Sequence, residues 1–261
     1  MNASEYLDGV RHLPLGSLRD LTGGAPWVLL SPHPDDESLG AGGLIAAACD
    51  AGERVDVVLI TDGGASHPQS QQYPRQRMIE LRRTELEDAT SILGLPRDQL
   101  HHLGLPDTQA PTEGPPFEAA VDAIAAICAH AGAKSLFVTW DGDPHCDHEA
   151  SARIAEAVCR RNPGIALWAF PIWGWHLDPS LPLDRPPPRG FRLDISAQRA
   201  RKRAAINAHV SQMTGLIDDD PNGFRFTDDR LAPFLGQFEH YLKVSPHEPK
   251  NRDDPGGLLR G

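Results

Sequence analysis

Short apolar runs alternate with longer segments of helical spacing along most of this chain, and this alternation constrains the fold more than any other feature. Strands are expected at residues 27–30, 55–60, 101–105, 135–140, 165–170 and 191–195, and helices at 44–49, 73–93, 117–130, 148–161 and 198–210. The run at 55–60 is almost wholly apolar, as expected for a parallel strand that is covered on both faces. The pattern predicts an α/β fold, a Rossmann-like three-layer sandwich with a mostly parallel sheet.

The chain has 261 residues, a length that one α/β domain with one core can accommodate. We therefore expect a single domain over residues 1–261, with a turn-rich lead-in (1–25) and a polar tail (246–261) at its periphery. Proline is dense between residues 171 and 188, which predicts a long surface loop.

Charge and composition exclude several classes of partner. A formal net charge of -11 argues against a surface for nucleic acid or anionic membranes, because both need clustered Lys and Arg. The sequence has no apolar run near the roughly 18 to 20 residues of a transmembrane helix, and no export signal. The four cysteines form no C-x-x-C pair, which favours reduced thiols. We expect a soluble, cytoplasmic protein and leave its oligomeric state open.

A polar cluster directly follows the first expected strand. Residues 31–37 read Ser-Pro-His-Pro-Asp-Asp-Glu, which places one imidazole and three acids at the end of a buried strand. Either Asp35 or Asp36 could cap the next helix, but capping explains only one acid. Adjacent acids repel each other, and a bound cation would relieve that repulsion. Because ligands of open α/β sheets bind beyond the carboxyl ends of strands, this cluster predicts a metal site.

A second cluster follows the strand at 135–140, and its members are Asp141, Asp143, His145, Asp147, His148 and Glu149. Two histidines and one carboxylate, with a fourth position open to water, form the ligand set of many catalytic zinc sites. Together the two clusters can supply that set as His33, Asp36 and His148.

These residues resemble those of the LmbE-like, or PIG-L-like, N-acetylglucosaminyl deacetylases. The resemblance rests on the hexapeptide at 32–37, on His145-Cys146-Asp147-His148, and on features in the same order between them at 61–63, 81–85, 93–94 and 105–107. It extends to Lys202, Ala205, His209 and Ser211-Gln212, and so covers most of residues 27–215. Cys146 is a departure, because many relatives carry proline between the two histidines.

The resemblance implies one zinc ion per chain, held by His33, Asp36 and His148, with Asp35 as general base. It also implies that a positively charged His145 stabilises the oxyanion. Zinc lowers the pKa of its water, but a carboxylate must still carry the proton from that water to the leaving amine. Asp147 is expected to orient His145. The predicted reaction removes an acyl group, in particular acetyl, from an amino sugar or a sugar conjugate and releases the free amine.

Substrate contacts are expected from five side chains, namely Arg82, Asp107, Trp175, His176 and Lys202. The resemblance makes Arg82 a substrate clamp, and the alternative is an ion pair with Glu85 on the same helix. Trp175 and His176 could stack on a sugar ring or simply cover the core. The lid-like segment at 63–74 and the loop after residue 171 are expected to set specificity.

Three other interpretations deserve comparison with the deacetylase. Gly40-Ala41-Gly42-Gly43 follows a strand as a dinucleotide fingerprint does, but Ile45 occupies its third glycine position, so these glycines are expected to allow close helix packing. A metal-containing sugar-binding module remains possible, although it has no need of a non-ligating carboxylate such as Asp35. A metal-dependent phosphoesterase would usually require two metals, whereas the sequence offers one clear ligand set.

Overall fold

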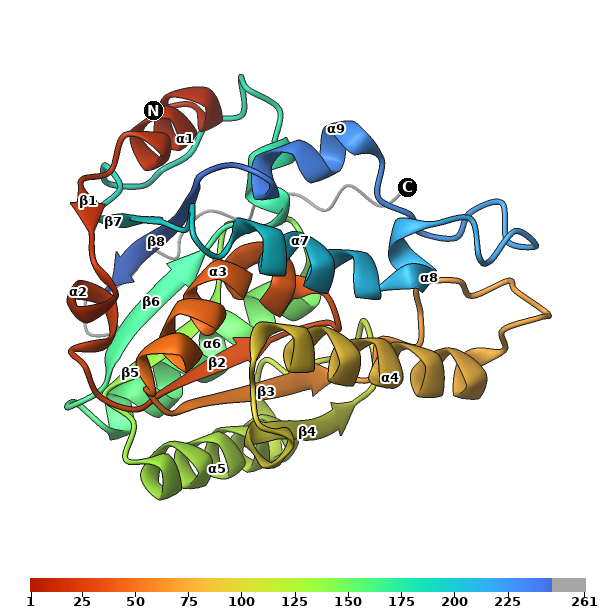
Figure 1. Cartoon of the computed structure of the whole chain (residues 1–261), viewed down its shortest axis with the longest axis horizontal. Coiled ribbons are helices and arrows are strands. Elements are labelled where there is room, and N and C mark those ends of the chain that lie inside the picture. The colour runs from red at the N-terminus through yellow and green to blue at the C-terminus, as the bar shows by residue number, and fades with distance from the viewer. Residues whose placement is uncertain (246–261) are drawn as a thin grey trace.

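The computed structural model describes residues 1–245 (Figure 1), so the predicted tail at 246–261 lies outside the described residues. The strands are β1 (Leu15–Gly16), β2 (Trp27–Ser31), β3 (Val55–Thr61), β4 (Leu100–Leu105), β5 (Ser135–Thr139), β6 (Ala166–Phe170), β7 (Gly190–Asp194) and β8 (Phe238–Val244). The α-helices are α1 (Ala3–Arg11), α2 (Leu18–Thr22), α3 (Asp36–Ala51), α4 (Arg75–Leu93), α5 (Gly114–Ala131), α6 (Cys146–Arg161), α7 (Arg199–Ala208), α8 (Val210–Met213) and α9 (Asp228–Leu231). Three 3-10 turns are η1 (Arg97–Gln99), η2 (Trp173–His176) and η3 (Ala232–Phe234).

The strands of the described chain form one sheet in the order β1-β7-β8-β6-β5-β2-β3-β4. Every neighbouring pair is parallel except the two that β8 makes, with β6 and with β7. The predicted mostly parallel α/β fold is therefore confirmed.

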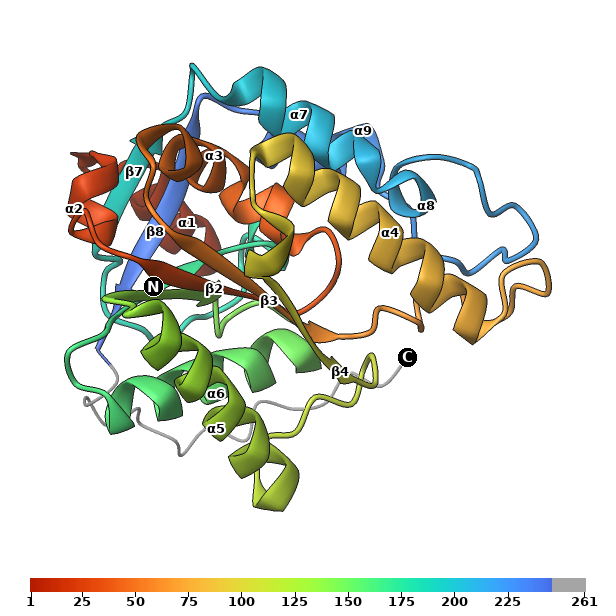
Figure 2. The same cartoon turned by 60° about the horizontal axis from the view of Figure 1, so that its bottom comes forward.

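Helices cover both faces of the sheet (Figures 1 and 2). Helices α3, α4 and α7 lie over one face, where they bury Leu29, Phe137 and Tyr241. Helices α5 and α6 lie over the other face and bury Leu30 and Leu136. Strand residues thus alternate between two hydrophobic cores, because successive side chains of a strand point to opposite faces.

Helix α3 packs unusually close to the sheet because it lacks side chains at its contact points. A Cβ atom added to Gly40 would come within 2.1 Å of the Phe170 ring, and one added to Gly43 would come within 2.4 Å of Ile195. The expectation that these glycines allow close packing is confirmed. They bring the first turn of α3, which carries the acidic cluster, directly against the sheet edge.

The lead-in and the last strand differ from expectation. Residues 3–11 form α1, whose face at Ala3, Tyr6, Leu7 and Val10 is buried, instead of the expected turns. Strand β8, between β6 and β7, was not predicted, because the inward-facing Glu239 interrupts the apolar pattern of that segment. Within residues 1–245, no helix combines the length and apolar character that crossing a bilayer requires.

The sheet has a switch point at β2. The chain leaves β2 through α3 and returns in β3 on one side, while β5 lies on the other side. Connections that run in opposite directions leave a crevice at the carboxyl ends of such strands. The loops after β2 and β5 both open into this crevice, and they carry the two polar clusters.

Candidate metal centre and active site

The loop after β2 turns directly into α3, so Asp36 lies in the first turn of the helix. The carboxylate of Asp36 turns back over the loop, and its Oδ2 accepts from the backbone N–H of His33 at 3.0 Å. Asp35 occupies the position before the helix, but its side chain makes no capping hydrogen bond. Helix capping therefore does not account for Asp35.

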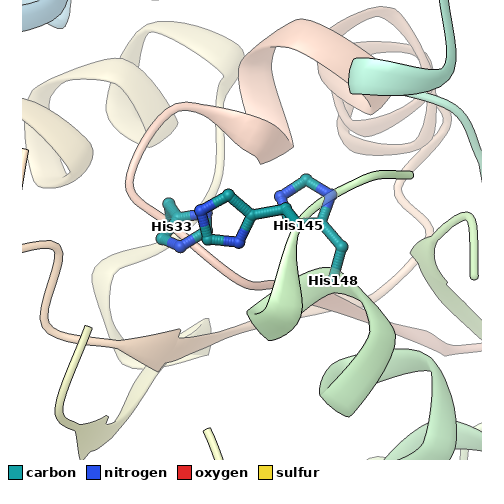
Figure 3. A group of neighbouring side chains, drawn as sticks. All are labelled: His33, His145 and His148. Carbon is teal, nitrogen blue, oxygen red and sulfur yellow. The ribbon is translucent and has the colours of Figure 1, made fainter. Parts of the chain in front are cut away.

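The carboxylate of Asp36 lies close to a nitrogen of each of two histidines. Oδ2 of Asp36 lies 3.2 Å from Nδ1 of His33 and 3.2 Å from Nε2 of His148. A tetrahedral zinc ion with bonds of about 2.0–2.1 Å separates its ligand atoms by about 3.3 Å. Nε2 of His148 is buried and has no hydrogen-bond partner, as expected for an atom that serves a metal. The spacing from the aspartate oxygen to each nitrogen fits the predicted ion. His33, His145 and His148 also form a group that could hold a metal, because one ligand atom of each lies within 4.8 Å of the others (Figure 3).

Carboxylates on the far side of the His33 and His148 rings fix the orientation of these two rings. Nε2 of His33 contacts Oδ2 of Asp147 at 3.0 Å and Oδ1 of Asp107 at 3.4 Å, while Nδ1 of His148 contacts Oδ2 of Asp143 at 2.9 Å. Such partners hold the proton on the outer nitrogen and leave the inner nitrogen free for a metal. Burial lowers the pKa of His148, but the charge of Asp36 and the hydrogen bond to Asp143 outweigh it and raise the pKa to about 9. The cluster therefore favours a positive charge at its centre.

The contacts of Asp147 differ from expectation. Its carboxylate does not orient His145; it accepts from His33 and from the backbone N–H groups of Thr108, at 2.7 Å, and Ala110, at 3.0 Å. His145 is instead held by the helix that it caps, because the backbone N–H of Asp147 donates to its Nδ1 at 3.2 Å.

The cap also determines the protonation of His145. An Nδ1 atom that accepts a hydrogen bond leaves the ring proton on Nε2. Burial, together with the charges of His33 and His148, lowers the pKa of His145 to about 4. The geometry thus favours a neutral ring that donates through Nε2, in place of the positively charged ring expected from the sequence.

Asp35 is a buried carboxylate held in a rare backbone conformation, with φ at 136°. Burial raises its pKa to about 7 even though the guanidinium of Arg82 opposes the shift. A pKa near neutrality is the value that suits a general base.

Arg82 is buried and bonds to the loop that follows β2 and to the loop that follows β3. It donates from NH1 to the carbonyl of Gly63 at 3.0 Å, and from NH2 to the carbonyl of Pro34 at 2.6 Å and to Oδ2 of Asp35 at 3.1 Å. It does not form the ion pair with Glu85 that was the alternative interpretation, because both oxygens of Glu85 accept from Ser211.

Of the other expected substrate contacts, one lies beside the clustered histidines and two lie in a separate cavity. Asp107 is buried between His33 and the backbone N–H of Ala65, to which it is bonded at 2.8 Å. Trp175 and His176 line a cavity of about 520 Å³ to which the three clustered histidines do not contribute.

Lys202, which was expected to contact the substrate, instead pairs with a buried carboxylate. Its ammonium is buried and binds Oε1 of Glu239 at 2.7 Å, which links α7 to β8. This is a structural contact, and we leave Lys202 out of the proposed substrate site.

Two surface loops border this edge of the sheet and lie side by side (Figures 1 and 2). These paired loops are residues 62–74 and 214–227. The carboxylate of Asp219, in the second loop, accepts from the hydroxyl of Ser70 at 2.6 Å and from the backbone N–H of Gln71 at 2.8 Å. The lid-like segment predicted from the sequence is thus bonded to a second segment of the chain.

Three functional candidates were given no role from the sequence. Asp143 belongs to the second polar cluster, but its contact with Nδ1 of His148 is visible only in the structure. Glu37 and His209 form a buried pair with 3.0 Å between Oε1 and Nε2. They are far apart in sequence, so no local pattern could have joined them.

A histidine and aspartate cluster lies at the switch point of a parallel sheet, with the buried carboxylate of Asp35 beside it, and such a cluster could hold a metal ion. Residues 28–159 match the family model described as PIG-L, GlcNAc-PI de-N-acetylase. The chain belongs to the PIG-L family, and it is an enzyme of the deacetylase type, a hydrolase of amide bonds.

Two curated relatives align with most of the chain. The probable N-acetyl-alpha-D-glucosaminyl L-malate deacetylase 2 of Bacillus cereus is 30% identical over 195 residues, which cover 74% of this chain and 86% of the relative. The 1D-myo-inositol 2-acetamido-2-deoxy-alpha-D-glucopyranoside deacetylase of Mycolicibacterium smegmatis is 26% identical over 268 residues, covering 86% and 91%. Among solved structures, the N,N'-diacetylchitobiose deacetylase of Pyrococcus horikoshii superimposes with a TM-score of 0.62 at 20% identity, covering 85% of this chain and 84% of that one.

Proposed function

We propose that this protein is a zinc-dependent deacetylase that hydrolyses the N-acetyl amide of an amino sugar joined to a small polar group. The observation that carries the proposal is the position of Asp36 Oδ2, which lies 3.2 Å from His33 Nδ1 and 3.2 Å from His148 Nε2. One zinc ion per chain would be held by these atoms. Asp35 lies beside them as a buried carboxylate that the ligand set does not use.

Three groups have separate roles in the proposed reaction. A zinc ion bound here supplies a Lewis acid that polarises the amide carbonyl and makes a water molecule more acidic. Asp35 takes the proton from the attacking water at its carboxylate and delivers it to the departing nitrogen, so that the amine leaves neutral. His145 donates its Nε2 proton as a hydrogen bond to the carbonyl oxygen while that oxygen gains negative charge.

The substrate class follows from the relatives. Both curated relatives carry names of deacetylases that act on an N-acetylated glucosamine joined to malate or to inositol. A glucosamine with a small polar aglycone is therefore the substrate class that we propose for this chain.

The test begins with purified protein and a panel of N-acetylated glucosamine conjugates, from which release of the free amine is measured. Metal content is measured in the same preparations. We expect about one zinc per chain and amine release from at least one conjugate. A protein that neither binds zinc, iron or cobalt nor releases any amine would contradict the proposal.

Two variants then separate the base from the ligands. Asp35→Asn should keep its metal and lose catalysis by about a hundredfold or more, because general acid–base catalysis contributes about 10²–10⁴-fold. His148→Ala should lose metal affinity and activity together. Loss of metal from Asp35→Asn would show that Asp35 is a ligand and not the base.

A further inference from the structure

The backbone of Asp35 needs an external support. A residue other than glycine held at positive φ is strained and persists only where its surroundings enforce that conformation. At Asp35, φ is 136° and ψ is -30°. Its backbone N–H donates to Oε2 of Glu37 at 3.0 Å, so the carboxylate of Glu37 fixes the amide of the proposed base.

Glu37 is in turn held by a residue from the far end of the chain. Its Oε1 accepts from the hydroxyl of Ser38 at 2.6 Å and contacts Nε2 of His209 at 3.0 Å. Glu37 and His209 are both 0% exposed. Nδ1 of His209 is buried without a partner, so among the described residues the only side-chain hydrogen bond of His209 is the one to Glu37.

Residues 209–211, at the junction of α7 and α8, also contact the helix that carries Arg82, the second residue that holds Asp35. Ser211 donates from its backbone N–H and from its hydroxyl to Glu85, each at 2.7 Å. Glu85 lies three residues after Arg82 on α4, and Arg82 binds Oδ2 of Asp35. Residues 209–211 therefore contact both helices from which the backbone and the side chain of Asp35 are held.

We propose that His209, acting through Glu37, is the positioning residue that keeps Asp35 aimed at the reacting atoms. The proposal rests on the proposed function, in which Asp35 is the base. His209 touches no reacting group; it fixes the carboxylate that fixes the base. A displacement of about 1 Å in a catalytic group can cost about a hundredfold in rate, so loss of this support should appear in turnover.

The chain contains a matched control for the Glu37–His209 pair. Glu239 is also a buried carboxylate that accepts backbone N–H groups of α3, from Gly43 at 2.7 Å and Leu44 at 2.8 Å, and it also pairs with a side chain of α7, Lys202. It differs from Glu37 in binding the middle of α3 and not the amide of Asp35. Glu37→Gln and Glu239→Gln therefore make the same chemical change in two similar environments.

The experiment compares His209→Leu, His209→Gln, Glu37→Gln and Glu239→Gln. We expect kcat to fall about tenfold or more in His209→Leu and Glu37→Gln, with KM and metal content within about twofold of the parent protein. His209→Gln keeps an N–H donor and should recover most of kcat. Glu239→Gln should lower Tm by about as much as Glu37→Gln does, yet keep kcat within about twofold of the parent protein.

A second readout, amide hydrogen exchange of the peptide that contains Asp35, does not depend on activity. Exchange at residues 33–38 should accelerate in His209→Leu and Glu37→Gln and stay unchanged in Glu239→Gln. If kcat and this exchange are unaltered in His209→Leu, the positioning role is wrong. If the parent protein deacetylates nothing while the exchange still changes, the proposed function has failed and the structural support of Asp35 stands.

Discussion

Each charged group of the site has a specific partner, and these pairings decide what single substitutions do. His33 contacts three carboxylates, one on the inner nitrogen and two on the outer nitrogen. Asp35 has its carboxylate on Arg82 and its amide on Glu37. Because each partner binds through a specific atom, replacing it by a residue of the same charge does not restore the contact.

Arg82 provides the clearest case. Its guanidinium bonds to Gly63, Pro34 and Asp35 in two different directions, which one ammonium group cannot reproduce. We expect Arg82→Lys to fold and to bind metal but to lose about tenfold or more in kcat/KM. Arg83→Lys is the control, because Arg83 is exposed and pairs with Glu87 on the surface of the same helix. Equal activity of the two variants would mean that Arg82 has no part in catalysis.

His240 predicts how stability depends on pH. Burial, reinforced by the charges of Lys202, Arg192 and Arg11, lowers its pKa to about 4. The unfolded chain therefore takes up this proton first as the pH falls below about 6.5, and stability decreases until about pH 4.

The measurement is the free energy of unfolding of the parent protein and of His240→Phe, from urea titrations at about pH 7.5 and about pH 5. The phenylalanine keeps a ring against Trp175 and cannot titrate. The parent should lose up to about 2 kcal/mol more than the variant between these two pH values. Parallel losses in the two proteins would show that His240 does not titrate in this range.

At the scale of elements, the carboxylate of Asp143 connects the turn η2 to the candidate metal centre. Asp143 accepts from the backbone N–H groups of Ile172, at 3.0 Å, and Gly174, at 2.7 Å, and it contacts Nδ1 of His148 at 2.9 Å. The segment that follows β6 is thereby coupled to a proposed ligand that follows β5.

Removing the negative charge of Asp143 should weaken that ligand. Substitutions of such outer partners typically cost about 10–100-fold in metal affinity, and we expect this loss for Asp143→Asn. Competition with a chromogenic chelator measures the affinity. Glu149→Gln is the control, because Glu149 is in the same cluster but pairs on the surface with Arg153. An unchanged affinity in Asp143→Asn would remove Asp143 from the metal centre.

The sequence predicted elements best where one pattern dominated. The buried parallel strands and the helices α4, α5, α6 and α7 were found to within a few residues, because their apolar spacing is strong. Helix α3 was expected at 44–49 but begins at Asp36, because its first turn is made of acidic residues and its middle of glycines. Helix α1 was missed although its signal was present, in a capping box of Asn2 and Glu5 and in the spacing of its buried residues. Strand β8 was missed because its buried acid, Glu239, is stabilised by donors from α3 and α7 that only the fold brings near.

At the scale of the molecule, the two polar clusters were predictable, but their internal pairing was not. A strand end can be recognised in a sequence, and both clusters follow strands that flank the switch point. The choice of His33 over His145 as the partner of Asp147 depends on ring orientations that arise from packing. The family model ends at residue 159, whereas the support of Asp35 comes from His209. Residues remote in sequence therefore complete the site.

The hydrogen bonds between the paired loops have a consequence for how the sequences of these loops can change. Asp219 uses both carboxylate oxygens on the first loop, and Asp220 adds a bond to the backbone of Gln69 at 2.8 Å. An insertion in either loop alone would separate these donors from their acceptors. We therefore expect the two segments to be exchanged best as a pair, because a chimera that receives only one of them would lose these hydrogen bonds.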